Sequence, residues 1–203
     1  MIKLFLISSL ISFSVVVLAQ IETWHECKSC VQTQIWYKEL ASGKDFAVKS
    51  EAIVVADYHK LIETIKDIES FAEWVSNCKS VNVIKSNENG GIYRTIISRP
   101  WPLKDGEAYI QYYFVEDAVK QEFKMVLSCV TDSFKFDEKY QKITRFKAVW
   151  TVSKKDEKTL VLKYLAETGG PENMPGLVKR MFLCDAPCNT LNMLIYVVNH
   201  KNL

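Results

Sequence analysis

Glycine and proline are scarce in this sequence, which holds 7 glycines and 5 prolines among 203 residues. This scarcity excludes a collagen-like or low-complexity chain, and no Gly- or Pro-rich linker divides the sequence into separate domains. The formal net charge is only +2. The chain therefore lacks the basic excess that nucleic-acid phosphates attract, and we predict no nucleic-acid partner.

Motifs for catalysis and for metal binding are also missing. The three histidines, His25, His59 and His200, have neither metal-ligand nor catalytic-triad spacing. The sequence contains no nucleophile elbow, phosphate-binding loop or paired acidic motif. We therefore predict a protein that is not an enzyme, with no catalytic residue, no metal and no cofactor.

Only one long apolar run is present, and it lies at the N-terminus. It extends from Leu4 to Leu18, and Val17 and Ala19 supply the small residues that signal peptidase reads. The run is shorter than the roughly 20 residues that span a bilayer, which disfavours the alternative of an uncleaved anchor helix. We predict a signal peptide at residues 1–19, one domain at residues 20–203, and a periplasmic or secreted location.

All six cysteines follow the predicted signal peptide, and an even number in an exported chain favours disulfides. The alternatives are free or buried thiols, or a zinc or redox site at the C-x-x-C motif beside His25. A bridge between Cys184 and Cys188, one helical turn apart, would be strained, so we expect Cys129 to be a better partner for either. The pairing stays open, and the disulfide candidates are Cys27, Cys30, Cys78, Cys129, Cys184 and Cys188.

The first half of the predicted domain combines strands with two short helices. Asp57 is a suitable N-cap for a helix at residues 58–66, and a second helix is predicted at residues 68–77. The strands predicted around these helices cover residues 34–40, 46–56, 81–85 and 92–99, of which the last two form a hairpin.

Three later strands, at residues 122–129, 145–152 and 160–167, alternate apolar and polar residues. A period of two with one polar side is typical of an antiparallel sheet that has one face in water. The strand at residues 108–115 differs because both of its faces are aromatic. We interpret it as a strand that is covered on both faces or that forms an interface.

The last segment changes period and predicts one long amphipathic helix. Leu177, Met181, Cys184, Cys188, Leu191 and Ile195 follow each other at steps of four and three residues. Pro175 suits the first turn, and Pro187 should kink the helix because its ring blocks one backbone hydrogen bond. Such a helix can bury its stripe only against the sheet. The fold class is therefore α+β, a helix-grip in which a curved antiparallel sheet wraps around a long C-terminal helix, with two short helices between early strands.

Five segments carry motifs in an order that is typical of a known family. They are Trp24 with residues 34–37, residues 71–75 around Trp74, residues 100–107 (Pro-Trp-Pro-Leu-Lys-Asp-Gly-Glu), residues 169–178, and residues 185–191. Together they resemble a START-type lipid-binding domain of the Bet v 1-like helix-grip superfamily, in an exported bacterial form. The family's Arg-Asp pair is replaced here by Gly106-Glu107.

The resemblance implies a cavity between sheet and helix that binds or transfers a lipid or another hydrophobic small molecule. It further implies a monomer that contacts a membrane transiently. The alternatives are an enzyme of the cyclase, aromatase or hydrolase type, and a solid core built from the same residues. The expected ligand-binding residues, with Trp74 and Trp101 near the entrance, are Trp74, Arg94, Trp101, Tyr112, Phe123, Met125, Trp150, Tyr164, Leu177 and Met181.

Two further arguments bear on this cavity. Arg94 and Arg99 lie on opposite faces of one predicted strand, and Arg94 is the candidate for binding a head group or carboxylate, with a surface position as the alternative.

An empty apolar cavity of about 300 Å³ costs roughly 7 kcal/mol, against a typical total stability of about 5–15 kcal/mol. Any cavity is therefore small, supported by disulfides, or occupied.

Overall fold

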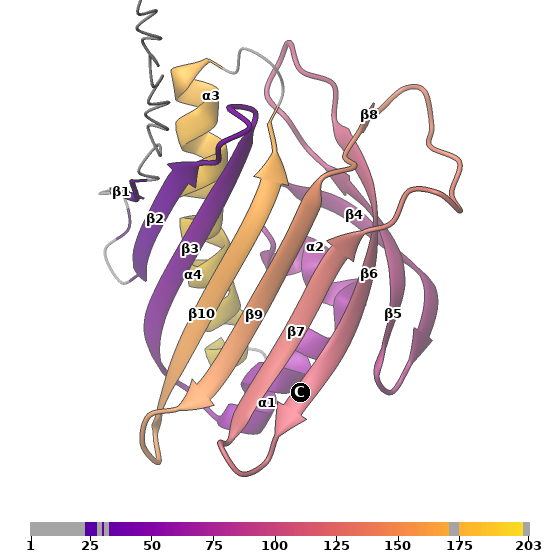
Figure 1. The fold of residues 1–203 in the computed structure, drawn as a ribbon. Helices are drawn as coiled ribbons and strands as arrows, with labels where there is room; N and C mark the ends of the chain where they lie inside the picture. Colours follow the sequence, from indigo (N-terminus) through magenta and orange to yellow (C-terminus); the bar gives the residue numbers. More distant parts are fainter. Residues whose placement is uncertain (1–22, 28–29, 31–32, 171–174, 201–203) are drawn as a thin grey trace, which may run out of the picture.

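A curved sheet with helices on one face forms the computed structural model, which describes residues 23–27, 30, 33–170 and 175–200 (Figure 1). The predicted signal peptide lies outside the described residues. Strands pair in the order β1-β2-β3-β10-β9-β7-β6-β5-β4, all antiparallel, and β8 pairs with β6 in parallel. The strands are β1 His25–Glu26, β2 Thr33–Glu39, β3 Asp45–Val55, β4 Cys78–Asn87, β5 Gly90–Ile97, β6 Gly106–Asp117, β7 Glu122–Cys129, β8 Gln141–Lys142, β9 Phe146–Lys154 and β10 Thr159–Gly169.

Side-chain alternation determines which face of this sheet is buried. On β7, Phe123, Met125 and Leu127 are buried, while the residues between them are partly exposed. This period follows from the pleat, which turns successive side chains to opposite faces. The antiparallel sheet with one wet face is confirmed.

The two early helices differ in how well the sequence predicts them. The helix α1 Tyr58–Lys66 begins as predicted, because the Asp57 carboxylate accepts a hydrogen bond from the Lys60 backbone N–H at 2.8 Å. The second helix is shorter than the predicted range of residues 68–77. It comprises a 3-10 turn, η1 Ile68–Ser70, and α2 Phe71–Trp74, and Val75 has extended backbone angles that end it.

The C-terminal helix lies behind the sheet in Figure 1 and has three parts, α3 Gly176–Arg180, a π-helical segment η2 Met181–Asp185, and α4 Ala186–His200. The Ala186 N–H donates to the Met181 carbonyl, five residues back. Pro187 follows at once and has no N–H, so the predicted disturbance at Pro187 takes the form of a π turn just before it.

This π turn shifts the phase of the helix, and the predicted apolar stripe is wrong in part. Cys184, Cys188 and Leu191 are buried as expected, whereas Leu177 is 81% exposed. Leu183, Leu194 and Val198 are buried in addition. By length and composition, the stretch Gly176–His200 could cross a membrane, with mean hydropathy 1.3. Leu183, Leu191, Leu194 and Val198 of this stretch are buried, so one side of it packs into the core.

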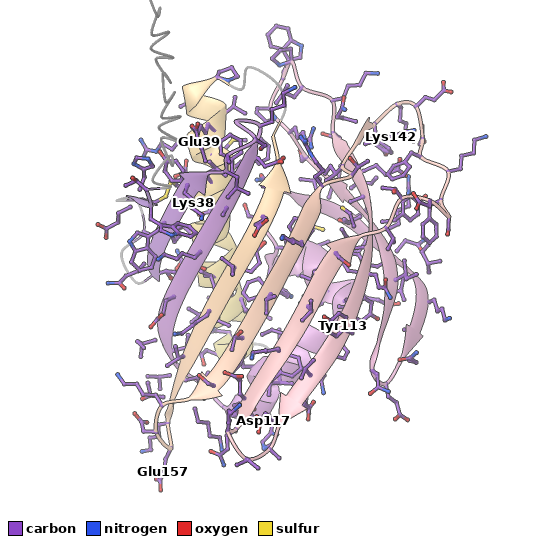
Figure 2. The ribbon with its side chains drawn as sticks, viewed as in Figure 1. Lys38, Glu39, Tyr113, Asp117, Lys142 and Glu157 are labelled. Carbon is purple, nitrogen blue, oxygen red and sulfur yellow. A yellow bond between two sulfur atoms is a disulfide. The ribbon has the colours of Figure 1, made fainter. Side chains whose placement is uncertain are left out.

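Part of the outer face of the sheet is covered by a segment that follows β7. Residues 130–145 return over β6, where the Tyr109 ring stacks on Phe134 with centroids 4.3 Å apart. Tyr113, on the same strand, stays 48% exposed and lies on the helix-free face of the sheet (Figure 2). The doubly aromatic strand is therefore covered on both faces at its beginning and open to solvent further along.

Candidate ligand cavity

A cavity of about 260 Å³ lies between the sheet and the helices, lined by residues from both layers. The sheet contributes residues of β3, β4, β5, β6, β7, β9 and β10, and the helices contribute residues of α2, η2 and the first turns of α4. The lining is mainly apolar, and it includes Phe46, Val48, Phe71, Ile97, Ile110, Leu127, Phe146, Phe182, Leu183 and Leu191.

Small side chains at inward positions explain why this part of the fold is hollow. Ala108 and Ala166 line the cavity, and Ala148, whose strand partners Leu127 and Ala166 both line it, is buried; all three alanines are at most 5% exposed. Ala148 and Ala166 are paired across β9 and β10. Since neither side chain extends beyond its β-carbon, the space that larger residues would fill between sheet and helix stays open.

Aromatic rings form the floor of the cavity. In the next inward row of the sheet, Trp150 is paired with Tyr164, and their rings lie 4.5 Å apart. The Trp74 ring meets Trp150 edge to face at 5.8 Å. Beyond this row, Phe123 and Leu162 are fully buried and fill the fold with a solid core. The space between the sheet and the helices is thus hollow in one half of the fold and filled by side chains in the other.

This division determines where the expected ligand-binding residues lie. Trp150 and Tyr164 line the cavity. Trp74, Tyr112, Phe123 and Met125 are buried, but they belong to the core around and below the floor and not to the lining. Met181 is partly buried on η2 without lining the cavity, and Trp101 and Leu177 are 92% and 81% exposed.

Arg94, the expected head-group ligand, does not line the cavity. Its Nε donates to the Glu107 carboxylate at 2.7 Å, and Glu107 is only 1% exposed. The other Glu107 oxygen accepts from the Asp137 backbone N–H at 2.7 Å. Thr95 and Ala108, the sequence neighbours of this pair, do line the cavity, so Arg94 and Glu107 point to the outer face. The pair attaches the covering segment to the sheet.

Arg99 is the arginine that lines the cavity, and the sequence analysis did not select it. Tyr93, Thr95 and Ile97 face inward at every second position of β5, and Arg99 continues this parity just beyond the strand. The alternation of inward and outward side chains along β5 could therefore have predicted that Arg99 points toward the cavity. Burial lowers the pKa of the Arg99 guanidinium, while the nearby Asp105 charge opposes that effect.

The other titratable groups of the described lining are neutral at physiological pH. Burial raises the pKa of Tyr93 and of Tyr164 above the ordinary tyrosine value. Burial also raises the pKa of the Cys78 thiol, although contacts with Thr95 and the Ser80 carbonyl act in the opposite direction. The Thr190 hydroxyl accepts a hydrogen bond from the Ser76 backbone N–H at 2.9 Å and so fastens α4 to the segment after α2.

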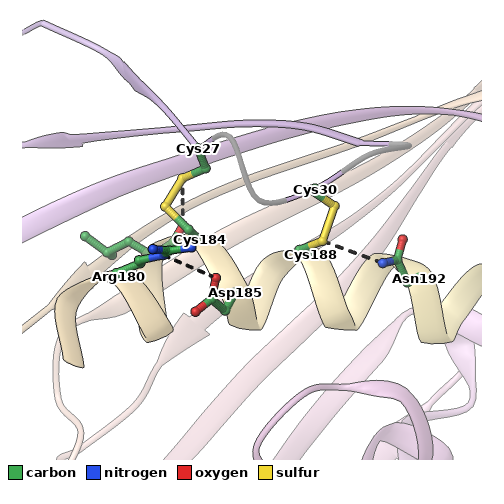
Figure 3. The surroundings of a disulfide bond; sticks show 8 residues. Cys27, Cys30, Arg180, Cys184, Asp185, Cys188 and Asn192 are labelled. Atoms are coloured by element: carbon green, nitrogen blue, oxygen red, sulfur yellow. Dashed lines mark hydrogen bonds and ion pairs between the residues drawn. A yellow bond between two sulfur atoms is a disulfide. The ribbon is translucent and has the colours of Figure 1, made fainter. Parts of the chain in front are cut away.

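Two disulfides join the N-terminal segment to the C-terminal helix (Figure 3). Cys27 is bonded to Cys184 and Cys30 to Cys188, with Cα atoms 5.6 and 5.7 Å apart. The four cysteines of the two closely spaced motifs thus pair with each other. The expectation that Cys129 would be the better partner for this helix is wrong, because Cys129 ends β7 and the helix turns its cysteines toward β2 and β3.

Cys78 and Cys129 are free thiols, so two of the six disulfide candidates form no bond. The Cys129 thiol donates to the Ile143 carbonyl at 3.4 Å. Burial raises the pKa of Cys129 to about 11. Within the described part of the chain, no group of three or more His, Cys, Asp or Glu side chains could hold a metal ion.

The comparisons with known proteins agree with this geometry. The family described as "Polyketide cyclase / dehydrase and lipid transport" matches residues 57–192, which is more than half of the chain. No curated protein sequence gives a significant match.

Solved structures with the same fold come from bacteria and from humans. A STAR-related lipid transfer protein fragment from Xanthomonas axonopodis superposes with a TM-score of 0.75 at 16% identity, covering 87% of this chain and 99% of that one. Human STARD10 gives a TM-score of 0.73 at 15% identity, covering 88% and 74%. Human StAR-related lipid transfer protein 5 gives 0.75 at 12% identity, covering 87% and 86%. The START-type helix-grip fold is confirmed.

Proposed function

Because the chain belongs to the polyketide cyclase / dehydrase and lipid transport family, we propose that it binds one small lipid-like molecule in the cavity and does not transform it. The hollow beside Ala108 and Ala166, lined mainly by apolar side chains, is the observation that carries this proposal. The lipid-transfer names of the similar structures support it.

The volume of the cavity also favours an occupant. A dry, closed apolar void of 260 Å³ would cost about 6 kcal/mol, which is a large share of the typical stability of a domain. The cavity is slightly smaller than the roughly 300 Å³ at which ligand pockets usually begin. Its occupant is therefore one small molecule or one chain of a larger lipid.

The chemistry of the lining supports binding over catalysis. A general base has to be deprotonated near the working pH, and the raised pKa values of Cys78, Tyr93 and Tyr164 keep these groups protonated. Arg99 remains a cation. The described lining therefore offers hydrogen-bond donors and a positive charge, which suit recognition of a ligand.

Delivery of such a ligand requires contact with a lipid surface, and two exposed apolar residues are suited to it. Trp101 lies two residues before the lining residue Leu103, and Leu177 belongs to α3, five residues before the lining residue Phe182. We assign both to a transient membrane contact beside the cavity. The two disulfides, together with the apolar N-terminal run, support export to an oxidising compartment, where the protein acts as a monomer.

Native mass spectrometry of the purified protein tests this function. The wild-type chain is expected to carry an additional mass that organic extraction releases, and to bind the neutral fluorescent probe N-phenyl-1-naphthylamine once extracted. In the variant Ala108→Leu/Ala166→Leu, both substitutions enlarge side chains that line the cavity, so probe affinity should fall at least about tenfold, a difference of roughly 1.4 kcal/mol.

The control is Ala72→Leu, which adds the same side chain at an exposed position on α2. This variant should bind the probe like the wild type. Circular dichroism of all three proteins verifies that the filled variant retains the fold. A wild-type protein that carries no extractable molecule and takes up no probe would contradict the proposed function.

A further inference from the structure

Arg99 is the only charged residue among the described residues that line the cavity. Its guanidinium forms no hydrogen bond or ion pair within the described part of the chain, and only its backbone N–H is engaged, by the Asp105 carboxylate at 3.1 Å. Arg99 is partly buried, and a guanidinium that has lost part of its contact with water is stabilised by an anion beside it. Asp105 acts on this charge only at a distance, so within the described lining the Arg99 guanidinium has no hydrogen-bonded anion.

The surroundings of Arg99 keep that charge available. Asp105 is the acidic group nearby, but its carboxylate accepts a hydrogen bond from Lys79 at 3.0 Å. This contact and the Arg99 N–H lower the pKa of Asp105, so that Asp105 and Lys79 form a neutral pair. The charges of Arg99, Asp105 and Lys79 thus sum to one positive charge, which lies on the cavity side.

Gly106 provides room for the guanidinium. A β-carbon at this position would lie 2.9 Å from Arg99 Nη2 and 2.6 Å from Ile143 Cδ1. Both distances are too short for a real β-carbon contact. Glycine at the first position of β6 is therefore what lets the Arg99 head lie against the strand end and line the cavity.

We propose that the ligand is an amphipathic monocarboxylate, whose carboxylate pairs with the Arg99 guanidinium and whose apolar part extends toward the floor formed by Trp150 and Tyr164. This inference rests on the proposed binding function and specifies its ligand class. A guanidinium offers two parallel N–H groups that match the two oxygens of a carboxylate.

The geometry also favours an extended ligand with its charge at one end. Tyr93 lies near the floor, since its ring contacts Phe71 and that of Phe71 contacts Trp74. From Tyr93 to Ile97 the strand advances roughly 13 Å, and Arg99 lies beyond Ile97. The charge and the floor are therefore at opposite ends of the cavity, as the head and tail of a fatty acid would be.

One guanidinium also discriminates between anions. A phosphate monoester carries a charge of about −1.5 to −2 at neutral pH, and Arg99 would neutralise only part of it in these apolar surroundings. A cationic head group would be repelled. A neutral head group would leave the guanidinium uncompensated, so a monoanion is the complementary charge.

Displacement of N-phenyl-1-naphthylamine by decanoate, decan-1-ol and decyl phosphate tests the proposal, because these probes share one chain length and differ in the head group. Wild-type protein should bind decanoate about 10- to 100-fold more tightly than decan-1-ol, the range expected for a charged hydrogen bond. Arg99→Gln should lose this preference and bind decan-1-ol like the wild type, and Arg99→Lys should retain part of it.

The matched control is Arg180→Gln, which removes an exposed arginine on α3 that forms an ion pair with Asp185 at 3.9 Å. It should keep the full preference for decanoate.

Equal wild-type affinities for decanoate and decan-1-ol would overturn the carboxylate assignment while leaving the proposed function intact. Tighter binding of decyl phosphate than of decanoate would overturn the monoanion assignment. If no probe binds, the proposed function itself fails. If Arg99→Gln does not fold, the ratio of decanoate to decan-1-ol affinity in the wild type and in Arg99→Lys still tests the carboxylate assignment.

Discussion

Individual side chains decide which parts of this sheet are hollow and which are solid. Ala148 on β9 and Ala166 on β10 leave space, whereas Phe123 on β7 and Leu162 on β10, two inward rows further along the sheet, fill it. The same alternation places Arg99 inward and Arg94 outward, so one arginine faces the cavity and the other is used for structure. A change at each arginine should therefore have a different consequence.

The pair formed by Arg94 and Glu107 should support stability and not ligand binding. In Glu107→Ala, the Asp137 N–H and the Arg94 guanidinium both lose a buried acceptor. We expect the free energy of unfolding to fall by about 2–4 kcal/mol, measured by urea denaturation. Glu116→Ala, which removes an exposed carboxylate from the same strand, should cost at most about 1 kcal/mol. Loss of decanoate binding in Glu107→Ala with unchanged stability would contradict this assignment.

At the scale of elements, periodicity predicted much of the fold, because strands and helices with one buried face carry their period in the sequence. It failed where the backbone departs from the regular period. The π turn at Met181–Asp185 rotates the first turns of the helix, so that Leu177 is exposed despite fitting the stripe.

The lining of the cavity was harder to predict than its fold. Alternation shows that a side chain such as Phe123 points inward, but it does not show how far along the strand the hollow extends. That limit depends on how α1 and α4 pack against the sheet, which is a long-range contact. The order of the cysteines likewise leaves their pairing open, and only the position of η2 and α4 beside β2 brings Cys27 and Cys30 to their partners.

The disulfides connect elements at opposite ends of the chain, and thiol counting tests their pattern. In native protein at pH 8, Ellman's reagent should react slowly, because with its pKa near 11 only about one Cys129 thiol in a thousand is ionised. Cys78 is also partly buried, with a raised pKa. Unfolding in urea should expose the two free thiols, and reduction should then release all six cysteines. Four or more reactive thiols before reduction would refute the pairing.

The whole molecule has two distinct ends. One end carries the hollow half of the grip, with Arg99, Leu103 and Gly170 in the cavity lining and Trp101 and Leu177 exposed beside it. The other end contains the solid core and the β6–β7 turn at the bottom of Figure 1, where Val119 is 95% exposed. A ligand that enters or leaves through the first end requires that end to face the lipid surface.

Sedimentation with vesicles of phosphatidylethanolamine and phosphatidylglycerol tests this orientation. In Trp101→Ser/Leu177→Ser, both apolar side chains that would enter the lipid interface are lost. Burial of one large apolar side chain contributes roughly 1.5–3 kcal/mol, so the partition coefficient should fall at least about tenfold. Val119→Ser removes an equally exposed apolar side chain from the opposite end and should leave the partition coefficient unchanged. Equal losses in both variants would mean that the protein meets the membrane without a preferred end, because a directed contact depends on the side chains beside the cavity and not on exposed apolar area in general.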